Sequence, residues 1–468
     1  MEKIMLKTRK KYDFTKGPIF WNLFKYTIPL MLTSTLQVFY NMADHAVVGK
    51  WSGNPLALAA VGSTTSMTSL LVNLMVGIAT GAGVIVAQSL GARDNDTLSR
   101  TVHTSISFAA ILGLAFSLLG LVASRGALTL IGTKTELMPD ALLYVRIICL
   151  GIPATAIYNF SAAILRSVGD SKTPLKILSA SGIINVLLNI FLVTVCHMSV
   201  GGVALATITS QYVSAFVVIR VLVGRRDEVY ALKREKLGID LAVLGRIIRY
   251  GLPAGIQSSL FSISNVIITS GINQLATASV SAKTILMNSS SLIYNAMNSY
   301  LHASMTATAQ NFGAKKNDRI RRTLGAALLQ VIVVGIVYGQ VLLFFSNDIN
   351  SLFIAYDDPN REIILNEARG LAKMLFCTYF ICGMVETTSG ALRGLGHSIL
   401  PMLISLFGIA GLRAGWILFG FPMERFHNLV GAYYAYPISW IVTFFILITL
   451  CITTWIKLGI LKIKKETV

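Results

Sequence analysis

Long apolar runs divide the sequence, and they constrain the fold more than any other feature. Each run is about 20 residues or longer, the length that an α-helix needs to cross about 30 Å of hydrocarbon. Of the 468 residues 54% are hydrophobic and 13% are charged, against about 25% charged in soluble domains. We therefore predict an all-α polytopic membrane protein and exclude a soluble multidomain enzyme. Twelve transmembrane helices are expected, at residues 18–44, 57–86, 101–124, 141–164, 175–195, 200–222, 242–271, 280–308, 323–346, 364–390, 399–420 and 429–456.

Lysine and arginine are distributed unevenly around these runs. If the N-terminus is cytoplasmic, the loops on its side carry most of the cations, whereas the outer loops carry isolated ones such as Lys283. This asymmetry follows the positive-inside rule, so we expect a multi-pass protein of the inner (cytoplasmic) membrane with both termini in the cytoplasm. The net charge of +19 is then a topology signal. We expect membrane lipids as partners and no nucleic acid.

An internal repeat halves the chain. Residues 163–174 and 390–401 share Leu, Arg, Gly, Ser and Pro at an offset of 227, and Pro29 recurs as Pro253. Six helices per half is an even number, so both halves insert in the same orientation and a pseudo-two-fold axis along the membrane normal relates them. We expect an N-terminal lobe at residues 1–224, a cytoplasmic linker at residues 225–240 and a C-terminal lobe at residues 241–468.

Asp44 is one of two acids that lie well inside the apolar runs. A carboxylate at membrane depth is costly unless it faces protein or water or stays protonated, so it is a functional candidate by default. Neutral polar residues accompany it on the same helical stripe and on two later runs: Gln37, Tyr40, Asn41, Asn185, Asn189, Thr207 and Gln211. If these side chains meet, they form a site for H⁺ or Na⁺. The alternative is a hydrogen-bonded cluster that only packs helices together.

The second half has different chemistry. Its repeat counterpart of Asp44 is Ile268, so it lacks the same ion site. Glu386 is the other acid inside an apolar run, and it is either a coupling or cargo-binding carboxylate or a residue paired within the bundle. Arg413 is the clearest deep cation. The expected lining of a cargo cavity combines residues of both halves: Gln37, Gln211, Gln257, Asn265, Asn288, Glu386 and Arg413.

The sequence contains none of the motifs of the common hydrolases or nucleotide-driven pumps. We find no GxxxxGK[ST] phosphate loop, no HExxH and no GxSxG. We therefore expect a protein that is not an enzyme and binds no cofactor. The energy for transport is then expected to come from an H⁺ or Na⁺ gradient or from the concentration gradient of the cargo itself.

The chain resembles the multidrug and toxic compound extrusion (MATE) family of the multidrug/oligosaccharidyl-lipid/polysaccharide exporter superfamily. The matching motifs are Pro29…Gln37…Tyr40-Asn41-Met42-Ala43-Asp44…Val48-Gly49, Gln88…Gly91 and Leu165-Arg166…Gly169-Asp170…Pro174. The resemblance implies two six-helix lobes and cation-coupled export of organic compounds. It also implies that Asp44 is the coupling aspartate, that Asn185, Asn189 and Thr207 match ion-site positions, and that Tyr40 lies one turn away. Asn189 replaces an Asp of some members, which leaves H⁺ and Na⁺ open.

We therefore predict an antiporter that exports organic, cationic or amphipathic compounds by alternating access. The alternative is a flippase for lipid-linked oligosaccharides or precursors, which should line its cavity with several Arg or Lys side chains. A membrane-embedded transferase would need clustered acids or histidines, and the six histidines are scattered. We expect a monomer that acts on small organic molecules.

Overall fold

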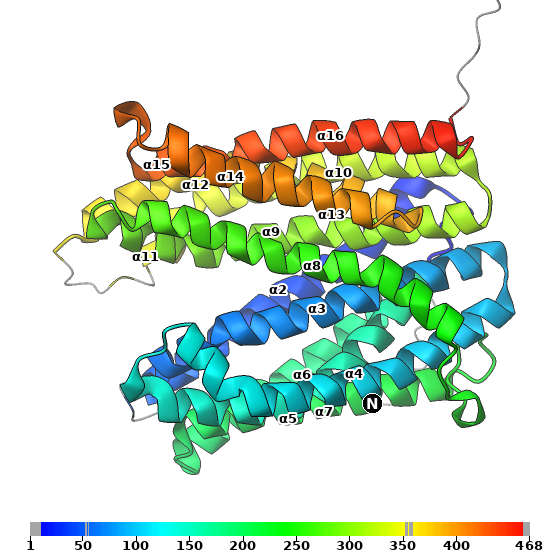
Figure 1. Ribbon diagram of the computed structural model, residues 1–468, viewed down its shortest axis with the longest axis horizontal. Helices are drawn as coiled ribbons and strands as arrows, with labels where there is room; N and C mark the ends of the chain where they lie inside the picture. The colour runs from blue at the N-terminus through cyan, green and yellow to red at the C-terminus, as the bar shows by residue number, and fades with distance from the viewer. Residues whose placement is uncertain (1–10, 52–53, 55, 352–353, 355–358, 462–468) are drawn as a thin grey trace, which may run out of the picture. The chain divides into compact units, whose positions relative to one another are not determined.

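The computed structural model describes residues 11–51, 54, 56–351, 354 and 359–461, without the side chains of residues 50, 260–263 and 288. Within this part of the chain there are helices and loops and no strand, which confirms the all-α prediction (Figure 1). The first half contains α2 (Ile19–Trp51), α3 (Ala57–Ala92), α4 (Asn95–Leu130), α5 (Met138–Ser167), α6 (Lys172–Ile190) with the π-helical η2 (Phe191–Val195), and α7 (Ser199–Gly224). The second half contains α8 (Leu241–Ile272), α9 (Thr277–Gly313), α10 (Asn317–Phe344), α11 (Ser346–Ser351), α12 (Arg361–Gly394), α13 (Ile399–Ser405), η4 (Leu406–Gly411), α14 (Leu412–Gly415), η5 (Trp416–Gly420), α15 (Leu429–Tyr433) and α16 (Ala435–Lys457).

Each of the twelve predicted membrane runs corresponds to one helix or to consecutive helical segments. Among the described residues, ten of these segments are long and apolar enough to cross a membrane. The other two are α2 and α9, which have 33 and 37 residues and therefore sufficient length. Their polar side chains lower their hydropathy, and α2 is the helix that carries Asp44.

The helices form two compact units, which we call unit 1 and unit 2. Unit 1 comprises Met1–Tyr12 and Thr35–Gly255, and unit 2 comprises Asp13–Ser34 and Ile256–Val468. One internal boundary, between Tyr12 and Asp13, precedes α2, and the other two lie inside helices, in α2 and α8, a few residues after Pro29 and Pro253. This division differs from the lobes expected at residues 1–224 and 241–468, because the first part of each of these two helices packs with the other half of the chain.

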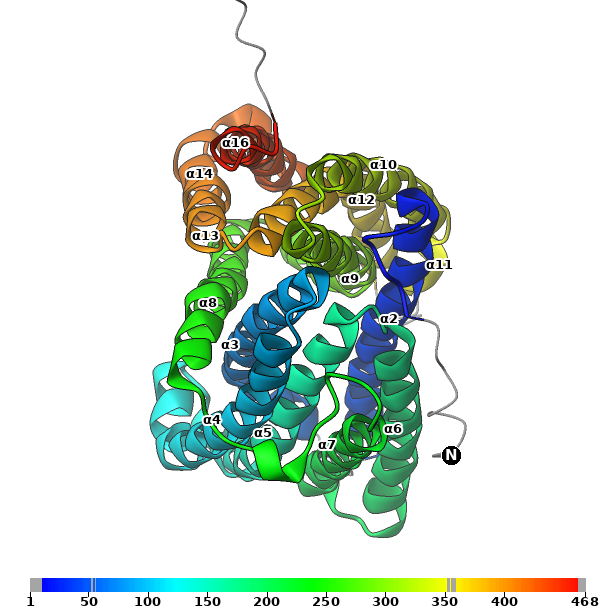
Figure 2. The same ribbon diagram turned by 90° about the vertical axis from the view of Figure 1, so that its right-hand side faces the viewer.

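In unit 1, α5 is the central helix and packs against α3, α4 and α7 (Figure 2). The first part of α8 is held against α3 by two pairs of glycines. A Cβ atom added to Gly77 would lie 2.1 Å from the backbone nitrogen of Gly255, and one added to Gly81 would lie 2.5 Å from that of Gly251. Small residues four apart allow two membrane helices to approach closely. This contact explains why residues 241–255 belong to unit 1.

The segment expected to link the lobes, residues 225–240, is also fixed to unit 1. The Arg225 guanidinium lies 2.6 Å from the Asp170 carboxylate, and the backbone N–H of Lys233 donates to His103 at 3.0 Å. Asp240 accepts hydrogen bonds from the backbone N–H groups at the start of α8, and these bonds, together with Arg100, hold the pKa of its carboxyl below its usual value. The segment is therefore anchored at its beginning, middle and end.

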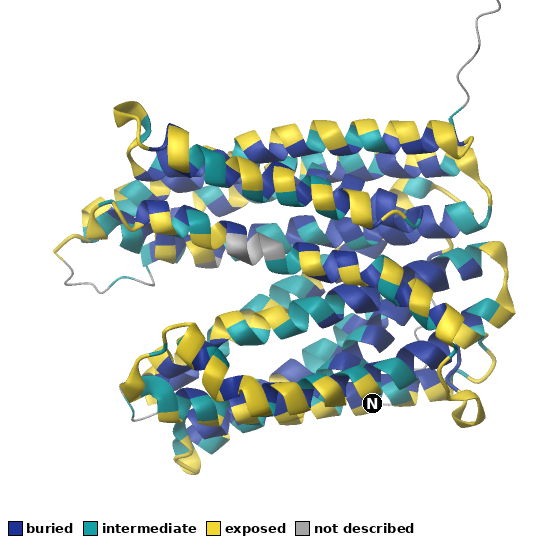
Figure 3. Ribbon diagram, in the orientation of Figure 1, coloured by how far each residue is buried: buried dark blue, intermediate teal, exposed yellow. Residues whose placement is uncertain are grey.

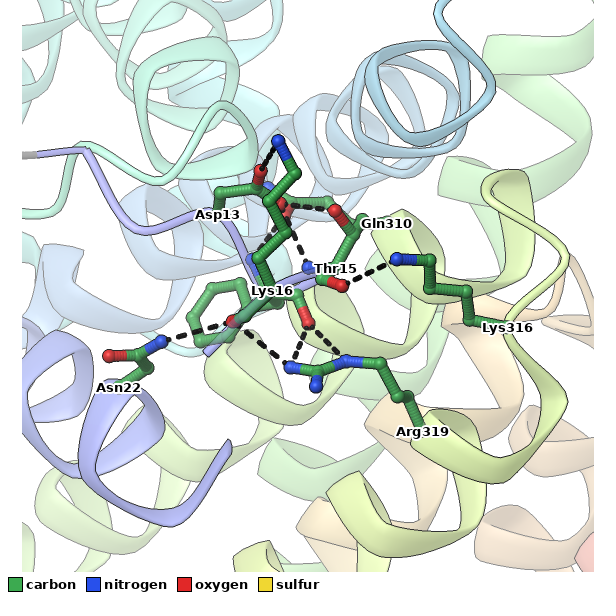
Figure 4. A network of polar contacts seen from close by, with 8 residues as sticks. Asp13, Thr15, Lys16, Asn22, Gln310, Lys316 and Arg319 are labelled. Carbon is green, nitrogen blue, oxygen red and sulfur yellow. Dashed lines mark hydrogen bonds and ion pairs between the residues drawn. The ribbon is translucent and has the colours of Figure 1, made fainter. Parts of the chain in front are cut away.

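In unit 2, α12 is the central helix and packs against α9, α10 and α16. The segment that precedes α2 is held by side chains of α9 and α10 (Figure 4). The Arg319 guanidinium donates to the backbone carbonyls of Phe14, Lys16 and Gly17, at 2.8–3.1 Å. Gln310 accepts from the Phe14 N–H at 3.0 Å. This segment lacks helical hydrogen bonds of its own, so these side chains satisfy its polar backbone groups.

The repeat is visible in the backbone as well as in the sequence. Gly169 and Gly396, at equivalent positions, have φ values of +87° and +89°. The helices α3 and α9 are each followed by a left-handed basic residue, Arg93 with φ 58° and Lys315 with φ 55°. The segments Gly91-Ala92-Arg93 and Gly313-Ala314-Lys315 thus end both helices in the same way, with the basic residue in the left-handed conformation.

The surface of both units carries many large apolar side chains. Val122 is 86% exposed, Leu130 is 90% exposed and Phe445 is 62% exposed. Exposed and buried residues alternate along α16 (Figure 3). Contiguous exposed apolar surface is disfavoured in water, so these faces are suited to lipid. The chain is a membrane-spanning protein.

Candidate functional site

The candidate ion site predicted around Asp44 is assembled within unit 1. Asp44 lies on α2, and its carboxylate accepts a hydrogen bond from the amide Nδ2 of Asn189 on α6. The same Nδ2 donates to Asn185 Oδ1 at 3.3 Å. The amide of Asn185 in turn donates to Thr207 Oγ1 on α7 at 3.5 Å. Four of the predicted residues, from three helices, therefore form one hydrogen-bonded chain.

The middle of this chain is buried, whereas Asp44 and Thr207 at its ends are half-buried. Asn185 and Asn189 are one turn apart on α6 and are 5% and 0% exposed. Directly after Asn189 the helix becomes π-helical over η2, Phe191–Val195. A π-helical turn shifts the register of the side chains that follow and often occurs at functional sites.

Tyr40 approaches α6 one turn before Asp44. Its hydroxyl donates to the Ser179 carbonyl at 3.3 Å, and its ring lies against Gly182, where an added Cβ atom would come within 1.9 Å of the ring. Tyr40 thus fixes α2 against α6 and does not bond to the Asp44 carboxylate. Two other members of the α2 stripe, Gln37 and Asn41, are exposed.

A cluster of apolar residues lies one turn beyond the polar chain on each of its three helices. Val47 and Val48 follow Asp44, Val193 follows Asn189, and Val203 precedes Thr207. We call this set, which also includes Ala57, Val61 and Val200, the valine cluster. It places buried apolar side chains at one end of the candidate site.

Tyr144 of α5 was not identified from the sequence. It packs against the valine cluster, and it interacts electrostatically with Asp44. No other candidate residue lies on α5, so the sequence did not indicate that Tyr144 lies near Asp44.

The donor set fits a small hard cation or a proton. Asp44 supplies a carboxylate, and Asn185, Asn189 and Thr207 supply neutral oxygens, which are the ligands that hard cations prefer. The Oδ1 atom of Asn189 is buried and has no hydrogen-bond partner among the described residues. An unpartnered acceptor beside a carboxylate is the expected surrounding of a bound cation, because a buried polar group otherwise needs a partner.

Unit 2 contains most of the other predicted cavity residues. Gln257 is 3% exposed, accepts from the Arg393 guanidinium at 2.7 Å and donates to Ser405 at 3.0 Å. Glu386 is 2% exposed and interacts electrostatically with Arg393. This pairing favours the interpretation of Glu386 as a residue paired within the helix bundle over its interpretation as a coupling or cargo-binding carboxylate.

Arg413 and Asn265 lie together in unit 2, with the guanidinium donating to Asn265 Oδ1 at 3.1 Å. Gln211 of unit 1 is half-buried, and its Oε1 has no partner among the described residues. The side chain of Asn288 lies outside the described residues. Lys283, counted among the outer-loop cations although the predicted run 280–308 includes it, lies inside α9 and is 9% exposed, so its placement in a loop was wrong.

Three comparisons relate this architecture to known proteins. A protein-family model described as MatE matches residues 29–191 and 253–416, together more than half of the chain. The chain is 26% identical over 447 residues to "Probable multidrug resistance protein YoeA" of Bacillus subtilis, and the match covers 94% of each protein. It is 21% identical over 426 residues to "Multidrug export protein MepA" of Staphylococcus aureus, covering 87% of this chain and 92% of the relative.

A solved structure has the same fold. It is described as the outward-facing conformation of a multidrug resistance MATE family transporter of the MOP superfamily. The TM-score is 0.89 at 20% sequence identity, and the match covers 98% of this chain and all of the other.

Proposed function

Because this chain belongs to the MatE family of membrane transporters, we propose that it exports organic compounds, cationic or amphipathic, across the cytoplasmic membrane in exchange for a cation. The observation that carries this proposal is the hydrogen-bonded chain from the half-buried Asp44 through two buried asparagines to Thr207, which offers one ionisable group among neutral oxygens. The names of the relatives, which refer to multidrug resistance and multidrug export, support the cargo class.

The proposed coupling step is a change in the occupancy of Asp44. A ligand shifts a conformational equilibrium only by as much as its affinities for the two states differ. Asp44 must therefore hold H⁺ or Na⁺ more tightly in one state of the transporter than in the other. Movement of α2 against α6 would change this affinity, because the Asn189 amide that contacts the carboxylate is on α6.

The topology that we propose follows the positive-inside rule. Both termini are cytoplasmic, and the two sequence halves, residues 1–224 and 241–468, are related by a pseudo-two-fold axis along the membrane normal. The protein functions as a monomer with small organic molecules as substrates, lipids around it and no cofactor.

The test is transport by purified protein in liposomes, with ethidium as cargo and with an imposed H⁺ or Na⁺ gradient. The parent should accumulate ethidium in response to one of the two gradients. Asp44→Asn keeps the size of the side chain and removes its charge, and it should reduce uptake to that of empty liposomes. The control is Asp96→Asn, since Asp96 has a side chain that is 78% exposed at the start of α4. Undiminished export by Asp44→Asn would refute the coupling role.

A second candidate function is a flippase for lipid-linked oligosaccharides or precursors. One observation favours it: the described part of unit 2 contains three buried cations, Lys283, Arg393 and Arg413, at 9%, 5% and 2% exposure. Translocation of a fluorescent polyprenyl diphosphate in the same liposomes, without export of ethidium, would favour the flippase over the antiporter.

A further inference from the structure

Two of the buried cations of unit 2, Lys283 and Arg413, have no acidic partner among the described residues. The third, Arg393, has Glu386 nearby. Moving a charge out of water is costly unless a counter-charge or a full set of hydrogen bonds replaces the water. The burial of Lys283 and Arg413 without a counter-charge therefore needs an explanation, whereas Glu386 accounts for the burial of Arg393.

Arg413 is only partly satisfied by its neighbours. Its Nη1 donates to Ser264 at 3.2 Å and to Asn265 at 3.1 Å, and its Nε donates to Ser439 at 3.4 Å. All three acceptors are neutral, and Nη2 has no acceptor among the described residues. The Tyr436 ring lies 3.8 Å from the guanidinium carbon and covers one of its faces. Neutral oxygens and an aromatic ring orient the guanidinium without neutralising it.

Lys283 approaches the same helix one turn further along. Its Nζ donates to Thr269 Oγ1 at 3.0 Å, the single acceptor that the described residues provide for its three N–H groups. Thr269 is four residues after Asn265 on α8, so the two side chains share a face, about 5–6 Å apart at Cβ. The two cations thus converge on adjacent turns of one helix.

This region is accessible from outside unit 2. Asn265 is exposed, and Tyr436 is half-buried, so the Arg413 guanidinium lies about one side chain below the surface. The short helix α14 that carries Arg413 lies between two π-helical segments, η4 and η5. The candidate ion site of unit 1 is likewise followed by a π-helical segment, η2, and such segments are frequent at functional sites.

We propose that Arg413 and Lys283 form a binding site for an anionic group, a carboxylate or a phosphate. Arg413 supplies its free Nη2 edge and Lys283 supplies its remaining N–H groups, and these charge-assisted hydrogen bonds replace the missing acid. The anionic group belongs to an exported compound or to a lipid headgroup. The case of an exported compound rests on the proposed export function, and it would extend the range of exported compounds to zwitterions.

The test is equilibrium binding to the full-length protein in phosphatidylcholine nanodiscs, followed by fluorescence anisotropy. The probes are tetramethylrhodamine, which carries a free carboxylate, and its methyl ester, which does not. The parent should bind the free acid at least about tenfold more tightly than the ester. Arg413→Gln and Lys283→Gln should each remove this preference and leave the affinity for the ester unchanged, whereas a merely structural defect would weaken both probes equally.

The matched control is Lys373→Gln, which removes an exposed cation from α12 in the same unit. It should retain the preference for the acid. A second arm adds phosphatidylglycerol to the nanodiscs. If a lipid phosphate is the occupant, this lipid should compete with the acid and raise the thermal unfolding midpoint of the parent more than that of either variant. The proposal is overturned if the parent binds the acid no better than the ester and phosphatidylglycerol stabilises parent and variants equally.

Binding at equilibrium requires neither an ion gradient nor Asp44. A failure of the export proposal would therefore leave the acid preference intact. Conversely, loss of this preference alone would leave gradient-driven export of ethidium intact.

Discussion

Asn189 is the residue on which the geometry of the candidate ion site depends most. It is 0% exposed, and its amide nitrogen donates to both Asp44 and Asn185. The residues of this site could be predicted from the sequence, because an acid inside an apolar run is rare and because helical spacing puts the neighbouring polar residues on the same face of their helices. The hydrogen bonds between these residues could not be predicted, because spacing along one helix does not specify which neighbouring helix supplies the partner.

The substitution Asn189→Leu should impair coupling while the protein still inserts. It removes the hydrogen bond to Asp44, and hydrogen bonds to charged groups contribute about 1.5–3 kcal/mol. Gradient-driven export should therefore fall by at least about tenfold. The control is Thr194→Val in the adjacent η2 segment, whose hydroxyl donates to a carbonyl of its own helix. Equal export by Asn189→Leu and the parent would show that this amide has no part in coupling.

The helices of this fold can be predicted from hydropathy, whereas their packing depends on residues such as glycine that change the hydropathy of a segment little. The apolar runs predicted every long helix to within several residues. The contact between α3 and α8 was not predicted, although both helices contain Gly-x-x-x-Gly, at Gly77 and Gly81 and at Gly251 and Gly255. A glycine pair in the sequence indicates a close approach of two helices but not which helix is the partner, so the contact between residues 241–255 and α3 could not be predicted.

The substitution Gly77→Val tests the contact between these helices. The added side chain would collide with the Gly255 backbone, which cannot move away as a flexible side chain could. Overpacking of this kind costs about 1–3 kcal/mol, so the thermal unfolding midpoint in detergent should fall. Gly62→Val, on the same helix, has nothing within 4 Å of its added Cβ and should have little effect. Equal midpoints for the two variants would contradict the packing described for unit 1.

At the scale of the whole molecule, the two units share a helical repeat and differ in the charges that they bury. Unit 1 brings Asp44 into a polar chain, whereas unit 2 holds Glu386 beside Arg393 and provides no acid for Arg413 and Lys283 among its described residues. The sequence predicted the repeat and the loss of the first ion site at Ile268. It did not predict the burial of Lys283, because a cation near a helix end resembles a loop residue.

The proposed orientation can be tested at a natural cysteine. Cys196 is exposed and lies between η2 and α7, which the topology places on the outer side. A membrane-impermeant maleimide should label it in right-side-out membrane vesicles and not in sealed inside-out vesicles. Cys196→Ser should abolish the labelling. Labelling from the inner side alone would reverse the topology and the direction of transport.

The most direct test of the central claim is whether cargo movement drives ion movement through Asp44. Linkage between two binding sites is reciprocal, so an ethidium gradient imposed across proteoliposomes should drive H⁺ or Na⁺ in the opposite direction, as reported by a trapped pH-sensitive or Na⁺-sensitive dye. The parent should show an ion flux that requires ethidium, and Asp44→Asn should show none. The same ethidium-dependent ion flux with Asp44→Asn as with the parent would contradict the assignment of Asp44 as the coupling group.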